Sequence, residues 1–235
     1  MRLGGVEMTW LGHSAFRFRF DDGTTLYVDP WLAGNPSCPP DEHHPARADA
    51  VFVTHGHYDH LGDGVELARS TGATVFANHE ISIYLLGQGI EQAVGLNKGG
   101  TVEGPAGLRA TMVDAVHSSG ISSGDCIVDG GDPAGWVFEF PGGPTVLHAG
   151  DTMPSRDMEL IREFWAPEIA LLPIGGHYTM DPRQAAWAAR TLGAQAVVPI
   201  HYGTFPVLAG TPDELREHAA GDFEVVTPEI GRPLR

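Results

Sequence analysis

The chain has 235 residues, 42% of them hydrophobic, which is enough for one sizeable core, so we expect a single domain over residues 1–235. Its net charge of −16, with Lys98 as the only lysine, argues against nucleic acid as a partner, because phosphate backbones require clustered Lys and Arg. There is no apolar run near the ~18 residues of a membrane helix, no signal-peptide core and no disulfide framework, which predicts a cytoplasmic protein without membrane contact.

The first predicted elements form a β-hairpin. Residues 15–20 alternate phenylalanine with arginine, the pattern of a half-buried strand, and residues 24–28 follow after a short turn. Asp29 ends the second strand, where it is either a plain turn residue or a hydrogen-bond partner for a metal-ligating histidine. His13 lies in a tight turn before the hairpin and either faces the site or only caps the hairpin.

The most informative segment is HGHYDH at residues 55–60, which directly follows an apolar, β-branched run at 49–54. We predict a buried strand there, with the histidines at its C-terminal end, where open α/β sheets place their chemistry. The histidines on either side of Gly56 point the same way only if the strand has already ended. Asp59 and His60 are adjacent in sequence, so their side chains point in different directions, which suits two neighbouring metal ions better than one. Imidazole with carboxylate favours zinc, manganese or iron over calcium.

Three further predicted strands end in ligand-type residues. The strands cover residues 108–116, 145–149 and 194–200, and they lead to His117, Asp151 and His201 respectively. Each residue alone would more often be structural. Together with HGHYDH they make four strand-terminal sites, and this set favours a metal centre.

The motifs HGHYDH, HS, GDT and HYG, in this order, resemble those of the metallo-β-lactamase superfamily of hydrolases. LGHSAF and LLPIGGHYTM are similar to a group named only as metal-dependent hydrolases, and more distantly to ascorbate-6-phosphate lactonases. The resemblance extends from about Met8 to Phe205 and implies a four-layer αββα sandwich. It also implies that one metal is held by His55, His57 and His117, the other by Asp59, His60 and His201, and that Asp151 bridges both. It favours a position in the site for His13.

Two segments near the predicted site have open roles. The Pro- and Gly-rich residues 33–45 form a long loop that is a candidate substrate wall or lid. His177 follows a predicted strand at 169–174, and we expect it either to bind substrate or protonate a leaving group, with Tyr178 beside it, or only to hold the loop. Asp59 and His177 are therefore the predicted catalytic residues. A helix is predicted at 183–192 after an Asp-Pro start, and another from Thr211.

The predicted activity is metal-dependent hydrolysis of a small ester, lactone or phosphodiester by a hydroxide that two divalent metal ions, zinc in first place, activate. Alternatives are a nuclease or phosphodiesterase acting on nucleotides or RNA, which the acidity disfavours, and a single-iron oxidoreductase on the same fold. A non-catalytic metal-binding protein would not need seven ligands. The expected partner is a small-molecule substrate, and homo-oligomerisation stays open.

Overall fold

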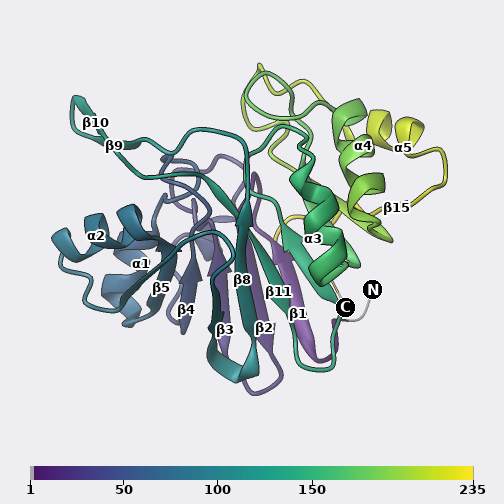
Figure 1. The fold of residues 1–235 in the computed structure, drawn as a ribbon. Coiled ribbons are helices and arrows are strands. Elements are labelled where there is room, and N and C mark those ends of the chain that lie inside the picture. The colour runs from purple at the N-terminus through teal and green to yellow at the C-terminus, as the bar shows by residue number, and fades with distance from the viewer. Residues whose placement is uncertain (1–2, 235) are drawn as a thin grey trace.

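The computed structural model describes residues 3–234, in which two large β-sheets pack face to face (Figure 1). Helices α1 and α2 cover the outer side of one sheet, and α3, α4 and α5 cover the outer side of the other. This is the four-layer αββα sandwich that the sequence predicted. Among the described residues, no helix combines the length and the apolar composition that crossing a membrane requires.

The first sheet contains seven strands in the order β16-β1-β2-β3-β4-β5-β6. Their bounds are Val6–Trp10 (β1), Phe16–Phe20 (β2), Thr25–Val28 (β3), Ala50–Phe52 (β4), Thr74–Asn78 (β5), Ala93–Leu96 (β6) and Pro233–Leu234 (β16). Its helices are Gly64–Thr71 (α1) and His79–Gly87 (α2), and a short 3-10 helix, Pro40–Glu42 (η1), precedes β4.

The second sheet also contains seven strands, in the order β15-β14-β13-β12-β11-β8-β7. Their bounds are Thr101–Glu103 (β7), Arg109–Asp114 (β8), Ala134–Glu139 (β11), Thr145–His148 (β12), Ile169–Pro173 (β13), Ala196–Ile200 (β14) and Glu224–Val225 (β15). Its helices are Asp157–Trp165 (α3), Pro182–Leu192 (α4) and Pro212–Ala219 (α5), and a 3-10 helix, Pro105–Gly107 (η2), precedes β8. Ile121–Ser123 (β9) and Cys126–Val128 (β10) form a separate two-stranded hairpin.

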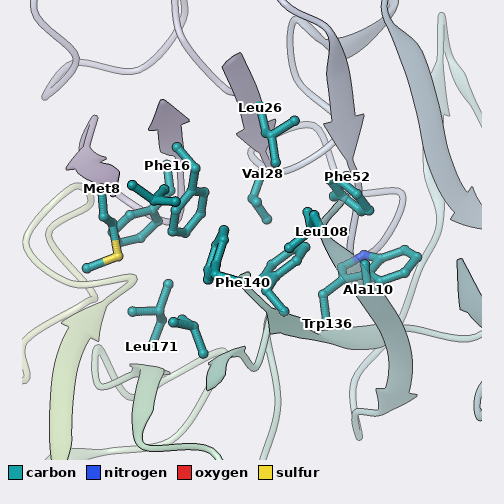
Figure 2. Packing of buried hydrophobic residues seen from close by; sticks show 14 of the residues in the cluster. Met8, Phe16, Leu26, Val28, Phe52, Leu108, Ala110, Trp136, Phe140 and Leu171 are labelled. Atoms are coloured by element: carbon teal, nitrogen blue, oxygen red, sulfur yellow. The ribbon is translucent and has the colours of Figure 1, made fainter. Parts of the chain in front are cut away.

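The main core lies between the two sheets and is rich in aromatic side chains (Figure 2). Alternation in β2 turns Phe16 and Phe18 inward, where both are buried, while the intervening arginines point outward. Trp136 from β11 packs against Phe52 of β4, and its indole N–H donates to the carbonyl of Val53 at 3.0 Å. Burying each such side chain contributes roughly 1.5–3 kcal/mol. The hydrogen bond from Trp136 to Val53 fixes the backbone immediately ahead of the HGHYDH segment.

The predicted helix starts are confirmed by their caps. The Asp181 carboxylate accepts from the backbone N–H of Gln184 at 2.7 Å, and the Gln184 side chain accepts from the N–H of Asp181 at 3.0 Å, so α4 begins with a capping box. Gly193 ends this helix in the left-handed conformation, with φ of 70°. Thr211 caps α5 in the same way, through Glu214.

The strand directions bring the candidate site together. β3, β4 and β5 run parallel in the first sheet, as do β12, β13 and β14 in the second, so their carboxyl ends lie at one edge of the sandwich. The strand predicted over residues 49–54 is shorter than expected and ends at Phe52. The reason is local: the N–H of Thr54 donates to the side chain of Asp29 at 2.8 Å instead of continuing the ladder.

The hairpin β9–β10 was not among the elements predicted from the sequence. Its strands have three residues each and are mostly exposed, so they carry no alternation of buried and exposed positions to reveal them. Figure 1 shows the hairpin projecting from the body of the protein, above α2 in that view.

Candidate metal centre

The HGHYDH segment turns sharply after β4. Gly56 is required at this turn, because a Cβ there would lie 2.6 Å from a side-chain carbon of Ile121 and 2.7 Å from the carbonyl oxygen of Ser119. The N–H groups of His60 and Leu61 both donate to the carbonyl of His57, which closes a tight turn. The turn is therefore packed directly against the segment that leads from β8 to β9.

The first cluster consists of His55, His57 and His117, whose donor atoms all lie within 4.8 Å of one another. His55 Nε2 and His57 Nδ1 are 3.0 Å apart. Burial, followed by the charge of His60, lowers the pKa of His55 well below 6.5. Burial also lowers the pKa of His57 and His117. These imidazoles are therefore neutral near pH 7, the form in which histidine binds a metal.

The second cluster consists of His13, Asp59, His60 and His201, again with donor atoms within 4.8 Å. Asp59 Oδ2 lies 3.2 Å from His13 Nε2 and 3.9 Å from His201 Nε2. Burial raises the pKa of Asp59, but the hydrogen bond from His13 and the charge of His60 outweigh it and lower the pKa to about 2. The Asp59 carboxylate is thus ionised near neutral pH and suited to a cation.

Asp151 lies between the two clusters. Its Oδ2 is 3.0 Å from His201 Nε2 and 3.5 Å from His117 Nε2, and its Oδ1 is 3.3 Å from His60 Nε2. Burial raises the pKa of Asp151, yet the nearby His201 and His60 lower it well below 3.8. Asp151, His55 and His60 form a third close group that connects the first two.

Unpartnered buried atoms show that this pocket fits metal ions. Among the described residues, His60 Nε2 and Asp151 Oδ1 are buried without a hydrogen-bond partner, a costly arrangement for polar atoms in a protein interior. Burial lowers the pKa of His60, but the carboxylates of Asp151 and Asp29 raise it well above 6.5. Such a set of imidazole and carboxylate donors is the one that zinc, manganese and iron accept.

Asp29 forms a hydrogen bond with His60, which is one of the two roles that the sequence left open for it. It is fully buried and adopts a left-handed backbone conformation, with φ of 47°. His60 Nδ1–H donates to Asp29 Oδ2 at 2.7 Å, and so does the hydroxyl of Thr54. The Thr54 hydroxyl oxygen also lies 3.0 Å from His55 Nδ1, so it accepts the N–H of that ring. Both histidines therefore present Nε2 to the site.

His13 lies inside the site rather than only capping the hairpin. Burial lowers its pKa to about 4, against the opposing effect of the hydrogen bond to Asp59, so the ring is neutral near pH 7. Nε2–H then donates to Asp59, while Nδ1 accepts from the hydroxyl of Thr204 at 3.0 Å. The His13 carbonyl accepts from the N–H of His201 at 3.1 Å, which joins this turn to the end of β14.

His148 was not among the site residues predicted from the sequence. It is fully buried, and its Nε2–H donates to the carbonyl of Ser14 at 2.9 Å. Its Nδ1 accepts from the N–H of Gly150 at 3.2 Å. His148 thus connects the hairpin turn of the first sheet to the turn that carries Asp151. The only sequence signal was its position three residues ahead of that aspartate.

A cavity of about 700 Å³ opens over the two clusters. Its lining residues are His57, Tyr58, Asp59, His117, Ser118, Gly120, Ser122, Ile127, Asp151, Tyr178, His201, Phe205 and Val207. Tyr178 therefore borders the same cavity as the two clusters. His177 is exposed and is not among the lining residues. The loop at residues 33–45 contributes none either, so the wall of the cavity comes from β9–β10 and from the segment after His201.

The chain is similar to known proteins over nearly its full length. The family model described as the beta-lactamase superfamily domain matches residues 24–202. A UPF0173 metal-dependent hydrolase from Koribacter versatilis is 48% identical, over 92% of this chain and 93% of that protein. Another, from Methanopyrus kandleri, is 47% identical, over 96% of this chain and 98% of that protein.

Solved structures give the same result. Igni18, a metallo hydrolase from the archaeon Ignicoccus hospitalis, superposes with a TM-score of 0.85 at 39% identity and covers 97% of both chains. An isothiocyanate hydrolase from Delia radicum gut bacteria, at 20% identity, shares the fold with a TM-score of 0.73, over 97% of this chain and 98% of that one. With four strand-end sites converging on one cavity, the chain belongs to the UPF0173 group of metal-dependent hydrolases in the beta-lactamase superfamily.

Proposed function

We propose that this protein hydrolyses a small ester, lactone or phosphodiester with two divalent transition-metal ions, zinc in first place and manganese or iron as alternatives. The observation that carries the proposal is the position of Asp151 between two clusters of imidazole and carboxylate donors. One ion would be held by His55, His57 and His117, and the other by Asp59, His60 and His201, with Asp151 touching both.

When bound, such a metal pair supplies a nucleophilic water at neutral pH and polarises the oxygen of the bond to be broken. The chain's own residues prepare the site for this chemistry. Asp29 and Thr54 hold His60 and His55 in the tautomer that leaves Nε2 free to face the metal clusters. The hydroxyl of Ser118, 3.2 Å from His57 Nε2, would accept a hydrogen bond from the Nε2–H of that ring and so leave Nδ1 without a proton.

Asp59 and Tyr178 are the residues for which we propose contact with substrate or attacking water. The carboxylate of Asp59 borders the cavity and stays ionised, so it can orient a water and take its proton. Tyr178 lines the cavity with its ring, 58% exposed, and offers a phenol as a hydrogen-bond donor. This position favours Tyr178 over His177 as the group that meets the leaving oxygen.

The alternative functions have less support. A nuclease needs cations for the flanking phosphates, and of the described residues that line the cavity, none is Lys or Arg. A single-iron oxidoreductase would leave the cluster around Asp59, His60 and His201 without a purpose. We therefore retain a small-molecule substrate and no nucleic acid as the proposed partners. A cytoplasmic location and a homo-oligomer stay predictions.

The test combines elemental analysis with a panel of substrates. Protein purified without chelator should contain two transition-metal ions per chain, and zinc- or manganese-loaded protein should hydrolyse at least one of the ester, lactone or phosphodiester substrates. A reproducible content of one ion per chain in metal-replete buffer would count against the binuclear site. Full metal content without turnover of any substrate class would count against the hydrolase.

A further inference from the structure

The cavity over the metal clusters has an uneven distribution of charge. Among residues 3–234, the ionisable side chains that line it are two carboxylates, Asp59 and Asp151, three histidines and two tyrosines, and none is Lys or Arg. The histidines and carboxylates all belong to the clusters proposed to hold the metals. Away from these clusters, the lining therefore offers hydroxyls and apolar surface but no fixed cation.

Several of the other lining residues have apolar side chains. Ile127 on β10 is 79% exposed and Val207 is 46% exposed, and both line the cavity together with Phe205. The Phe205 ring stacks on Trp31, with ring centroids 5.7 Å apart, and Tyr58 packs edge-on against the same indole at 5.8 Å. Ile127, Val207 and Phe205 thus line one cavity together, and exposed apolar groups gathered in this way mark a binding surface.

Ile127 is placed over the cavity by the hairpin. It lies so near Gly120 that a Cβ on this glycine would be 2.6 Å from Ile127 Cγ2. Gly120 belongs to the segment that leads from His117, a member of the first metal cluster, into β9. The hairpin therefore holds an apolar side chain beside the clusters at a position that contributes little to the core.

Charge on the substrate is disfavoured away from the clusters. The chain has a net charge of −16, which repels an anionic ligand over a distance. An anionic substituent lying on Ile127, Phe205 and Val207 would lose water without gaining an ionic partner, which is costly. A cavity of about 700 Å³ lies within the range of small-molecule sites, so it holds both the reacting group and a substituent.

We propose that the substrate carries its scissile group at the end of an uncharged, apolar arm, an alkyl or aryl substituent that lies against Ile127, Val207 and Phe205. Substrates that carry a phosphate or a carboxylate on the arm, away from the scissile group, are excluded by the same lining. The inference rests on the proposed function, which places the scissile group at the metal clusters. It adds the chemical class of the rest of the substrate, an uncharged apolar arm.

The experiment measures binding separately from hydrolysis. Octanohydroxamic acid and suberic acid monohydroxamate carry the same metal-binding head, but the second ends in a carboxylate. Titration calorimetry on the zinc-loaded full chain should give a Kd at least about tenfold lower for octanohydroxamic acid, because the carboxylate meets no cation. Ile127→Lys should reduce the ratio of the two Kd values to below about threefold, because the lysine provides a cation for the carboxylate.

Ile83→Lys is the matched control. Ile83 is 54% exposed on α2 and does not line the cavity, so this variant should keep the wild-type ratio. Equal or tighter binding of the carboxylate-bearing hydroxamate by the wild-type protein would overturn the inference, and so would a ratio that Ile127→Lys leaves unchanged. If the tenfold preference holds but no ester, lactone or phosphodiester that carries an octyl or octanoyl arm is hydrolysed, the hydrolase proposal fails while the preference for an apolar arm is retained.

Discussion

Replacing Asp29 with asparagine tests how the site is supported from behind. The carboxylate is fully buried and uses both oxygens. Oδ1 accepts from the N–H of Thr54 at 2.8 Å, and Oδ2 accepts from the Thr54 hydroxyl and from His60 Nδ1, both at 2.7 Å. Asparagine has nearly the same shape and tolerates the left-handed backbone at this position better than most residues. The substitution therefore changes hydrogen bonding and charge with little change in packing.

The expected magnitude follows from the number of acceptors. An amide has one acceptor oxygen, so either the N–H of Thr54 or the pair of donors on the other side would face an NH₂ group. A buried donor without a partner costs about 1–3 kcal/mol. His60 also loses the group that fixes its tautomer, which typically lowers metal affinity by about 10–100-fold. We expect Asp29→Asn to lower the free energy of unfolding and to weaken one of the two metal sites by this factor.

Competition against a chromophoric zinc chelator, with thermal unfolding of the metal-free protein alongside, measures both effects. Asp49→Asn is the control, since the Asp49 carboxylate also accepts a backbone N–H, from Thr25 at 2.8 Å, but does not contact the histidines. The control should keep wild-type metal affinity. If folded Asp29→Asn also binds both ions with wild-type affinity, the proposed support of His60 is refuted.

Other substitutions test separate parts of the site. Asp151→Ala should abolish most hydrolysis and release at least one metal ion, because three histidine nitrogens lie within 3.5 Å of its carboxylate; unchanged turnover and metal content would remove it from the site. His177→Ala should keep turnover within about threefold of wild type, well below the ~10²-fold loss expected of a general acid, because its exposed ring does not line the cavity. A hundredfold loss would restore the catalytic role expected from the sequence. Burial raises the pKa of the Cys38 thiol to about 12, so a disulfide reagent at about pH 8 should modify only the exposed Cys126 in the folded protein; two reactive thiols would contradict this.

The sequence predicted the fold and the grouping of the ligand-type residues for one reason. Each of these residues follows a strand whose buried, β-branched pattern is evident without a structure, and parallel strands bring their carboxyl ends to the same edge. His117, Asp151 and His201 lie far apart along the chain but follow β8, β12 and β14 of one sheet. The helix caps at Asp181 and Thr211 were predictable because capping depends on neighbours in sequence.

The parts that the residues alone left open or missed depend on contacts between distant segments. The role of His13 stayed open without the family resemblance, because its place in the second cluster requires hydrogen bonds to Asp59 and Thr204, and Thr204 is 191 residues away. The role of His148 requires the carbonyl of Ser14 in the opposite sheet. The hairpin β9–β10, which forms part of the cavity wall, was not predicted because its short strands have no regular alternation of buried and exposed residues. The sequence instead indicated the long loop at residues 33–45 as the candidate wall.

The division of the ligand-type residues between the two sheets has a consequence for how the protein matures. HGHYDH is made early in synthesis and belongs to the first sheet, whereas Asp151 and His201 follow strands of the second, and His201 is made near the end. A nascent chain therefore displays several histidines before the residues that complete their clusters exist. Because metal would bind the docked sandwich and not its separate halves, free metal should favour docking, with a gain in stability that grows with the logarithm of its concentration. Metal binding would then be a late step of folding that occurs only in chains whose two sheets have already docked.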